Sequence, residues 1–209
     1  MTHSYGLHGR FLAWFMARSE RSRYTAFVEG RKRHLLAGLE GLLVEIGSGT
    51  GPNLRYIPPE VRVVGIEPNP FMHEYFLKKA QAEGRSVELV QGVAEHLPFP
   101  DDSVDVVLST LVLCSVVEVD GVLKEVLRVL KPGGRFLFLE HVAAEEGTWL
   151  RGIQGFVRPF WKRIGDGCEP ARATATHLLH AGFREVSFQR FSVPLPLVSP
   201  HIAGIAEKG

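Results

Sequence analysis

The chain has 209 residues, 45% of them hydrophobic, and a formal net charge of +1 at pH 7. That size is enough for one α/β domain with its own core, and the near-neutral charge argues against a dedicated nucleic-acid-binding protein. Two cysteines are too few for a disulfide framework, and no apolar run reaches the roughly 18 residues of a membrane span. We therefore expect a single cytoplasmic domain over residues 1–209.

The predicted elements alternate between helices and strands along most of the chain. Residues 8–38 are expected to form two helices. Strands are predicted at 42–46, 61–66, 87–91, 104–109 and 134–140, with helices between them at 52–57, 70–84 and 119–131. A later helix is expected at 170–181, followed by strands at 183–190 and 201–206. β-Branched apolar strands that alternate with helices indicate an α/β fold, with a parallel sheet covered on both faces.

A glycine-rich loop, Glu45-Ile46-Gly47-Ser48-Gly49-Thr50-Gly51-Pro52-Asn53, follows the first strand. Its glycines let the backbone approach a ligand without a Cβ in the way, and we expect free N–H groups here and at the next helix N-terminus to bind a polar or anionic group. The sixth position from Gly47 is Pro52, which departs from the dinucleotide fingerprint, and no Gly-Lys-Ser/Thr of a P-loop follows. A glycine turn without a ligand is the alternative.

An acidic residue comes one βαβ unit later. Glu67 ends the second predicted strand, 20 residues after Gly47. A carboxylate at this interval can accept hydrogen bonds from both hydroxyls of a ribose. The following Pro68 and Asn69 start another helix, so a capping role for Glu67 is the alternative. Together with the glycine loop, the spacing favours ribose binding.

Four features together resemble the class I S-adenosylmethionine-dependent methyltransferases: the acid-x-Gly-x-Gly-x-Gly loop, the acid at 67, the segment Gly92–Asp105, and Lys131-Pro132-Gly133-Gly134. Gly92–Asp105 is similar to the adenine-side motif, with Val93 where an Asp is common. The resemblance implies S-adenosyl-L-methionine as methyl donor, S-adenosyl-L-homocysteine as product, and a Rossmann-like seven-stranded sheet whose last strand is antiparallel. It also implies cofactor contacts at the carboxyl ends of the strands. The candidates are Glu45, Gly47, Ser48, Gly49, Gly51, Asn53, Glu67, Pro68, Asn69, Ala94, Glu95 and Leu111.

Three further segments, Thr110–Val116, Glu140–Trp149 and Trp161–Cys168, resemble the methyltransferase-like 7 family of small-thiol S-methyltransferases, which is associated with endoplasmic reticulum and lipid-droplet membranes. This resemblance implies a small lipophilic thiol as the methyl acceptor. The animal members begin with a hydrophobic anchor that this sequence lacks, which points to a soluble relative. Methylation of nitrogen, oxygen or carbon in another small molecule or a phospholipid head group remains open, as does a non-catalytic cofactor-binding adaptor.

The candidate catalytic residues are His141, Asp166 and Cys168. His141 follows the fifth strand and its usual pKa of ~6.5 suits a base, but a structural histidine beside Glu140 is an equal alternative. Turn chemistry alone could explain Asp166, and Cys168 could contact the substrate or be a small buried side chain. Cys114 is interpreted as a wall of the cofactor pocket. Because the His and Cys residues lack a ligand-spacing signature, no metal is predicted.

The charges are unevenly distributed. Residues 1–40 carry 7 basic and 3 acidic side chains, residues 41–150 carry 9 and 16, and residues 151–190 carry 7 and 3. If the two basic segments lie together, they form a positive face over the site. The division expected is a helical lid at 1–40, a cofactor-binding core at 41–141, and an acceptor-side insertion with sheet closure at 142–209. The basic, aromatic N-terminal segment also fits peripheral contact with an anionic membrane; nothing indicates the oligomeric state.

Overall fold

The computed structural model describes residues 5–19 and 22–209, and within them seven strands form one sheet in the order β3-β2-β1-β4-β5-β7-β6. The strands are β1 (Leu42–Ile46), β2 (Arg62–Ile66), β3 (Val87–Val90), β4 (Val104–Thr110), β5 (Leu130–His141), β6 (Glu185–Ser192) and β7 (Pro200–Glu207). Strands β1 to β5 pair in parallel, and β7 lies antiparallel between β5 and β6. The predicted seven-stranded sheet with its antiparallel last strand is confirmed.

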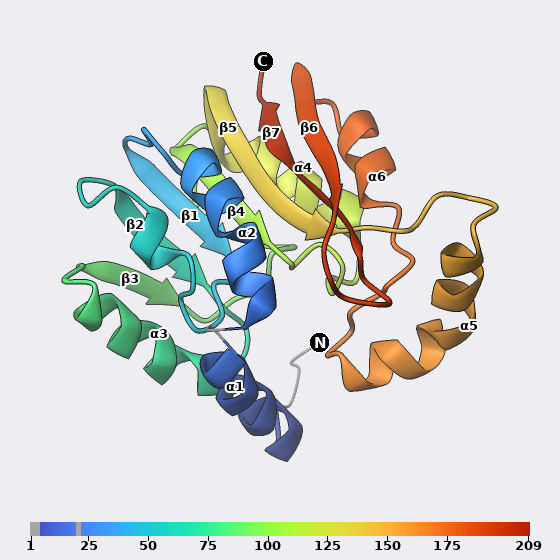
Figure 1. Ribbon diagram of the computed structural model, residues 1–209. Coiled ribbons are helices and arrows are strands. Elements are labelled where there is room, and N and C mark those ends of the chain that lie inside the picture. Colours follow the sequence, from blue (N-terminus) through green and yellow to red (C-terminus); the bar gives the residue numbers. More distant parts are fainter. Residues whose placement is uncertain (1–4, 20–21) are drawn as a thin grey trace.

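Helices cover both faces of the sheet (Figure 1). They are α1 (Leu7–Ser19), α2 (Arg23–Leu35), α3 (Pro70–Ala82), α4 (Val119–Val129), α5 (Trp149–Ile164) and α6 (Thr174–His180). Alternate side chains of the strands divide the core in two, because successive residues of a strand point to opposite faces. On β5, Phe136 and Phe138 belong to the core under α4 and α6, whereas Leu137 belongs to the core that includes Phe76 of α3.

Two predicted helices are shorter in the structure. The segment expected at 52–57 forms only a 3-10 turn, Leu54–Tyr56. Pro58 holds the preceding Ile57 in an extended conformation with ψ 133°, which ends the turn. Helix α6 begins at Thr174 and not at residue 170, because the preceding turn offers the carbonyl of Arg172 to the Ala143 amide. The helix N-terminus that was expected after the glycine loop is therefore absent from this described segment.

The N-terminal segment forms two helices, α1 and α2, as expected; residues 1–4 and 20–21, including the basic Arg21, lie outside the described part of the chain. Helix α1 is tied to the start of α3, because the Asn69 side chain donates to the carbonyl of Gly9 over 3.1 Å. Helix α5, to which sequence analysis assigned no element, extends away from the sheet in Figure 1. Its N-cap is Thr148, whose hydroxyl accepts from the Arg151 amide.

An ion pair on α4 fixes the loop between β3 and β4. Arg128 donates to the carbonyls of Leu97 and Phe99 and to the carboxylate of Glu125, and that carboxylate also accepts from the Leu97 amide. The hydrogen bond from Arg128 is the main cause that lowers the pKa of Glu125 to about 2. The ionised carboxylate thus stabilises the folded state at any pH above its unfolded pKa of ~4.3.

We predict that acid unfolding will report this ion pair. A folded pKa below the unfolded value means that the stabilisation is complete above about pH 5 and is lost as the pH falls towards 2. The free energy of unfolding of the wild type should therefore fall by roughly 2–3 kcal/mol more over this range than that of Glu125→Gln. Denaturant titrations at several pH values measure the difference. Glu88→Gln, in an exposed pair with Arg62, is the control and should follow the wild type.

Candidate functional site

The glycine-rich loop takes its shape from three left-handed glycines: φ is 58° at Gly47, 55° at Gly49 and 79° at Gly51. A Cβ at Gly47 would lie 2.5 Å from Cγ2 of Val112, and one at Gly51 would lie 2.9 Å from Leu54. The amides of residues 48, 49 and 51 are bonded within the protein, to Ile66 O, Glu67 Oε2 and Ser48 O. The expectation that the loop presents free amides is therefore wrong for these three, because the loop uses them to hold its own conformation.

The Glu67 carboxylate connects the loop to α3. Its Oε2 accepts from the Gly49 amide over 2.9 Å, and its Oε1 accepts from the Asn69 amide over 2.8 Å. Burial raises the pKa of this carboxyl, and the two amide bonds oppose that shift. Each carboxylate oxygen has a second lone pair and can accept another hydrogen bond. The position is consistent with both predicted roles, a contact at the start of the helix and an acceptor for ligand hydroxyls.

Other predicted cofactor residues use their side chains inside the protein. Asn69 caps α3 by accepting from the Phe71 amide. Asn53 donates to Glu45 over 2.6 Å and to Thr110 over 3.1 Å. Ser48 turns towards β2, where a Cβ at Gly65 would lie 2.7 Å from its hydroxyl. The cofactor roles of these residues, and of Pro68, stay predictions.

Of the adenine-side candidates, Glu95 lies close enough to Tyr5 for their charges to interact. Ala94 is buried, and the Glu95 carboxylate accepts from the Val117 amide over 3.0 Å. Burial, followed by the charges of Asp166, Glu67 and Glu95, raises the pKa of Tyr5 to about 12. Asp166 itself is exposed, with φ 51°. Its catalytic role stays a prediction.

A buried carboxylate that sequence analysis did not assign to the site shapes the turn after β4. Glu140 Oε1 accepts from the Ser109 hydroxyl over 2.6 Å and from the Val112 amide over 3.1 Å. Burial raises the pKa of Glu140 to about 7. Leu111, a predicted cofactor contact, begins this turn with φ 59°, a strained value for a leucine. In the sequence, the feature that could have identified Glu140 as a site residue is its position as a carboxylate at the end of an otherwise apolar strand.

The turn brings Cys114 to two of the predicted catalytic residues. His141 ends β5, and its Nε2 lies 3.1 Å from Sγ of Cys168, which also accepts from Nε1 of Trp161 over 3.4 Å. Ligand atoms of Cys114, His141 and Cys168 all lie within 4.8 Å of one another, so the three could hold a metal ion. Sequence analysis predicted no metal for want of a ligand-spacing signature, and the grouping of these three side chains was not foreseen. The spacing of these residues along the sequence did not indicate a shared site, because they come from three separate segments.

Hydrogen bonds to the Cys168 sulfur change the acidity of both thiols. Cys114 and then His141 lower the pKa of Cys168 well below its ordinary value, although partial burial opposes this. Cys114 is a free thiol, and its hydrogen-bonding contact with Cys168 together with complete burial raises its pKa. Sequence analysis treated Cys114 only as a pocket wall, whereas the structure makes it a polar partner of Cys168.

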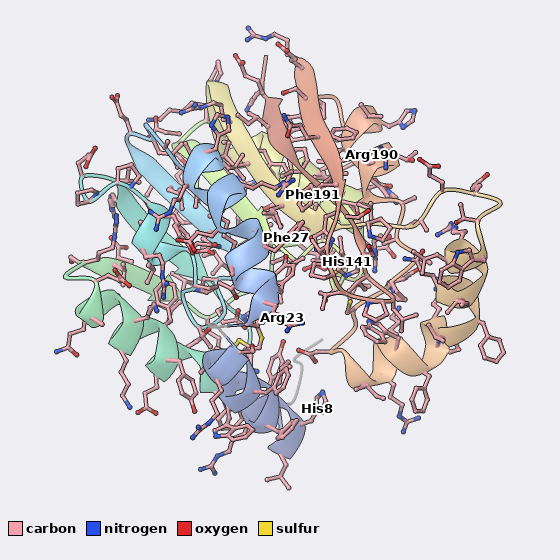
Figure 2. All side chains as sticks on the ribbon, viewed as in Figure 1. His8, Arg23, Phe27, His141, Arg190 and Phe191 are labelled. Carbon is pink, nitrogen blue, oxygen red and sulfur yellow. The ribbon has the colours of Figure 1, made fainter. Side chains whose placement is uncertain are left out.

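A second histidine lies behind this cluster. His201 on β7 packs against His141 with ring centroids 6.2 Å apart, and the Tyr24 hydroxyl of α2 lies 3.4 Å from its Nε2. Burial lowers the pKa of His201 to about 4, which keeps the ring neutral. A cavity of about 410 Å³ adjoins it, with Leu150 and Phe191 in its lining. In Figure 2, His141 appears between α2, which carries Arg23 and Phe27, and α5, with Arg190 and Phe191 on β6.

Comparisons with known proteins identify the family. Human thiol S-methyltransferase TMT1B is 42% identical over 195 residues, which cover 87% of this chain and 80% of that protein. Human TMT1A is 41% identical over 199 residues, covering 88% and 81%. This chain belongs to their family. Residues 44–138 also match a protein family whose description is 'Methyltransferase domain'. The chain is therefore an S-adenosylmethionine-dependent methyltransferase.

The solved structures that resemble this chain support the fold. A putative methyltransferase from Bacillus halodurans superposes with a TM-score of 0.69 at 18% identity, covering 86% of this chain and 97% of that one. The [4+2]-cyclase SpnF superposes with a TM-score of 0.71 at 22% identity, covering 90% of this chain and 83% of that one. Because one of these folds carries a cyclase, the fold alone does not define the reaction.

The residues around the glycine loop fit the chemistry of S-adenosylmethionine. Three buried atoms, Glu45 Oε2, Ser48 Oγ and Asn53 Oδ1, have no hydrogen-bond partner among the described residues. Unpaired buried acceptors are costly, and the carboxylate of Glu45 and the amide oxygen of Asn53 are acceptors of the kind that the ammonium group of an amino acid binds. Glu67 offers acceptors to ribose hydroxyls. The side chains that a Cβ at Gly49 would meet are the flexible Met16 and Met72, at 3.7 and 3.8 Å.

We predict that Glu67→Gln weakens binding of S-adenosylhomocysteine. The amide would point a donor at one of the two backbone N–H groups that Glu67 now accepts, and it would remove charge-assisted bonds worth about 1.5–3 kcal/mol each. Calorimetry should show a dissociation constant about 10- to 100-fold higher. Glu74→Gln, at an exposed position on α3, is the matched control and should bind like the wild type. An unchanged affinity in Glu67→Gln would remove Glu67 from the ribose role.

Proposed function

We propose that this enzyme methylates a small lipophilic thiol. The observation that carries the proposal is the cluster of Cys114, His141 and Cys168, which lies one turn from the glycine loop because Val112 packs against Gly47. The names of the human relatives, thiol S-methyltransferases, support the same acceptor. The exposed aromatic side chains of α5 and the cavity beside His201 suit an apolar acceptor.

The protein's task in this reaction is mainly to align the acceptor and exclude water. Bound S-adenosylmethionine supplies an electrophilic methyl group on its sulfonium sulfur. We assign Glu67 to the ribose hydroxyls and the unpaired atoms of Glu45 and Asn53 to the ammonium group. A thiol with a pKa of ~8.5 is already partly thiolate at neutral pH, so it needs little help from a base. Arg190 lines the cavity beside His201 and brings a positive charge to that side of the site.

A product assay tests the acceptor class. We predict that a panel of matched alkyl thiols, phenols and amines, incubated with the enzyme and S-adenosylmethionine, will yield a methyl thioether in mass spectra and at least a tenfold lower rate for the other acceptors. A product from phenols or amines alone would contradict the thiol proposal and favour nitrogen or oxygen methylation. Binding of S-adenosylmethionine without any methylated product would favour a non-catalytic adaptor.

We also propose that α1 and α5 contact a membrane surface. Neither these nor any other helix in residues 5–19 and 22–209 is long and apolar enough to cross a membrane. Helix α1 nevertheless exposes Phe11 and Phe15, and α5 exposes Phe156 and Phe160 to 86% and 71%. Both helices carry several basic side chains and lie along the lower edge of the molecule in Figure 1. Exposed aromatic residues beside basic ones are typical of helices at an anionic interface.

Vesicle sedimentation tests this contact. The double variant Phe156→Ser/Phe160→Ser should bind anionic phosphatidylserine vesicles at least tenfold more weakly than the wild type, because it removes two exposed aromatic side chains that would insert into the interface. Leu179→Ser, at an exposed position on α6 away from α5, is the control and should bind like the wild type. Wild-type protein that stays in the supernatant with anionic vesicles would contradict the proposal.

A further inference from the structure

Three soft metal ligands converge at the carboxyl ends of β4 and β5. Cys114 follows β4, His141 ends β5, and Cys168 lies in the loop after α5. Their ligand atoms lie within 4.8 Å of one another, with 3.1 Å between His141 Nε2 and Cys168 Sγ. A tetrahedral Zn²⁺ ion with bonds of about 2.0–2.3 Å separates its ligands by roughly 3.5–3.8 Å. Side-chain adjustments of less than about 1 Å would therefore admit the ion.

The backbone holds these ligands together. The amide of Glu169 donates to the carbonyl of Cys114 over 2.8 Å, so the loop that carries Cys168 is fastened to the turn that carries Cys114. The neighbouring Gly167 has φ 85°, and a Cβ there would lie 3.0 Å from the carbonyl of Ser115. Only a glycine allows this close approach without strain. The arrangement positions the two cysteines before any ligand binds.

One hydrogen bond to the cluster resembles those found around metal ions, whereas Nδ1 of His141 has no partner among the described residues. The Cys168 sulfur accepts a hydrogen bond from the Trp161 indole, as ligands in metal sites commonly do from outer groups. Cys114 and His141 are only 2% and 4% exposed, whereas Cys168 is partly accessible. Glu140 is turned to the Ser109 hydroxyl and the Val112 amide. Glu140 is therefore not one of the ligands, and the cluster among the described residues consists of the thiols of Cys114 and Cys168 and the imidazole of His141.

We propose that Cys114, His141 and Cys168 bind one Zn²⁺ ion whose fourth position accepts the acceptor thiolate. Thiolates with imidazole favour zinc over magnesium or calcium, and three protein ligands with one open position are the arrangement of catalytic zinc sites. This inference rests on the proposed thiol methylation. It assigns the cluster a specific task, the capture of the acceptor sulfur beside the cofactor loop.

The chemistry balances without an oxidant or reductant. On coordination the acceptor thiol loses its S–H proton to solvent, because a metal-bound thiol is deprotonated. The acceptor sulfur then forms the new S–CH3 bond as the bond between the methyl group and the sulfonium sulfur breaks, and the electron pair of the broken bond stays on that sulfur. The neutral thioether is a poorer zinc ligand than the thiolate and leaves the open position.

Cobalt substitution tests the site directly. We expect the tag-free, full-length chain, kept reduced with a phosphine, to bind one Co²⁺ per chain and to show a sulfur-to-cobalt charge-transfer band with intense tetrahedral d–d bands. His141→Gln and Cys168→Ser should bind Co²⁺ at least ~100-fold more weakly, since loss of a direct ligand exceeds the 10–100-fold effect of losing an outer-shell partner. His180→Gln, at an exposed position on α6, is the matched control and should bind like the wild type.

The acceptor role has its own measurement. Addition of an alkyl thiol to the cobalt-loaded chain should intensify the charge-transfer band, whereas the corresponding methyl thioether should leave it unchanged. A folded wild type that binds no stoichiometric metal would overturn the metal site. A charge-transfer band that does not change when the alkyl thiol is added would overturn the role of the metal in binding the acceptor. A metal-free chain, verified by elemental analysis and circular dichroism, that methylates thiols at the wild-type rate would overturn the inference and leave the proposed function intact. A thiol-responsive metal with no thioether product would support the site and contradict the proposed function.

Discussion

The structure of the site depends on the Glu140 carboxylate. It lies at the end of β5, fully buried, and accepts from Ser109 and from the Val112 amide of the turn after β4. These hydrogen bonds offset only part of the lost hydration, because Oε2 has no hydrogen-bond partner among the described residues and burial raises the pKa of the carboxyl to about 7. By fixing this turn, Glu140 decides where the side chains on either side of it can lie.

Two consequences follow from that turn. Val112 packs against Gly47 and so limits the conformation of the glycine loop, which in turn is held by Glu67. Two residues later, Cys114 is brought to His141 and Cys168. One strand-end carboxylate therefore links the cofactor loop to the cluster on the acceptor side. The short connection explains how a fold shared with other chemistries can present a thiol-directed site here.

The sequence predicted what depends on local pattern. The β1 strand, its glycine loop and Glu67 were identified because a βαβ unit fixes the interval between the loop and the acid. The seven-stranded sheet with its antiparallel last strand was predicted correctly because the resemblance covers most of the chain. The short 3-10 turn was missed because helical pattern was weighed above the effect of Pro58 on Ile57. Helix α5 was missed because its glycines and Pro159 lower helix propensity.

The grouping of Cys114 with Cys168 lay beyond sequence reasoning for a different reason. It requires the loop after α5 to bond to the turn after β4, through the Glu169 amide and the Cys114 carbonyl. No periodicity or spacing encodes a contact between segments so far apart in the chain. The same holds for Tyr24, which reaches His201 from α2. Tertiary contacts of this kind decide the acceptor side, whereas local sequence decides the cofactor side.

A crystal structure with S-adenosylhomocysteine would test the central claim most directly, because the sulfur of that molecule marks the place from which the methyl group leaves. The account predicts that its ribose hydroxyls bind Glu67 and that its sulfur points towards Cys114, His141 and Cys168. A ligand whose sulfur points away from that cluster, or whose ribose binds elsewhere than at Glu67, would contradict it.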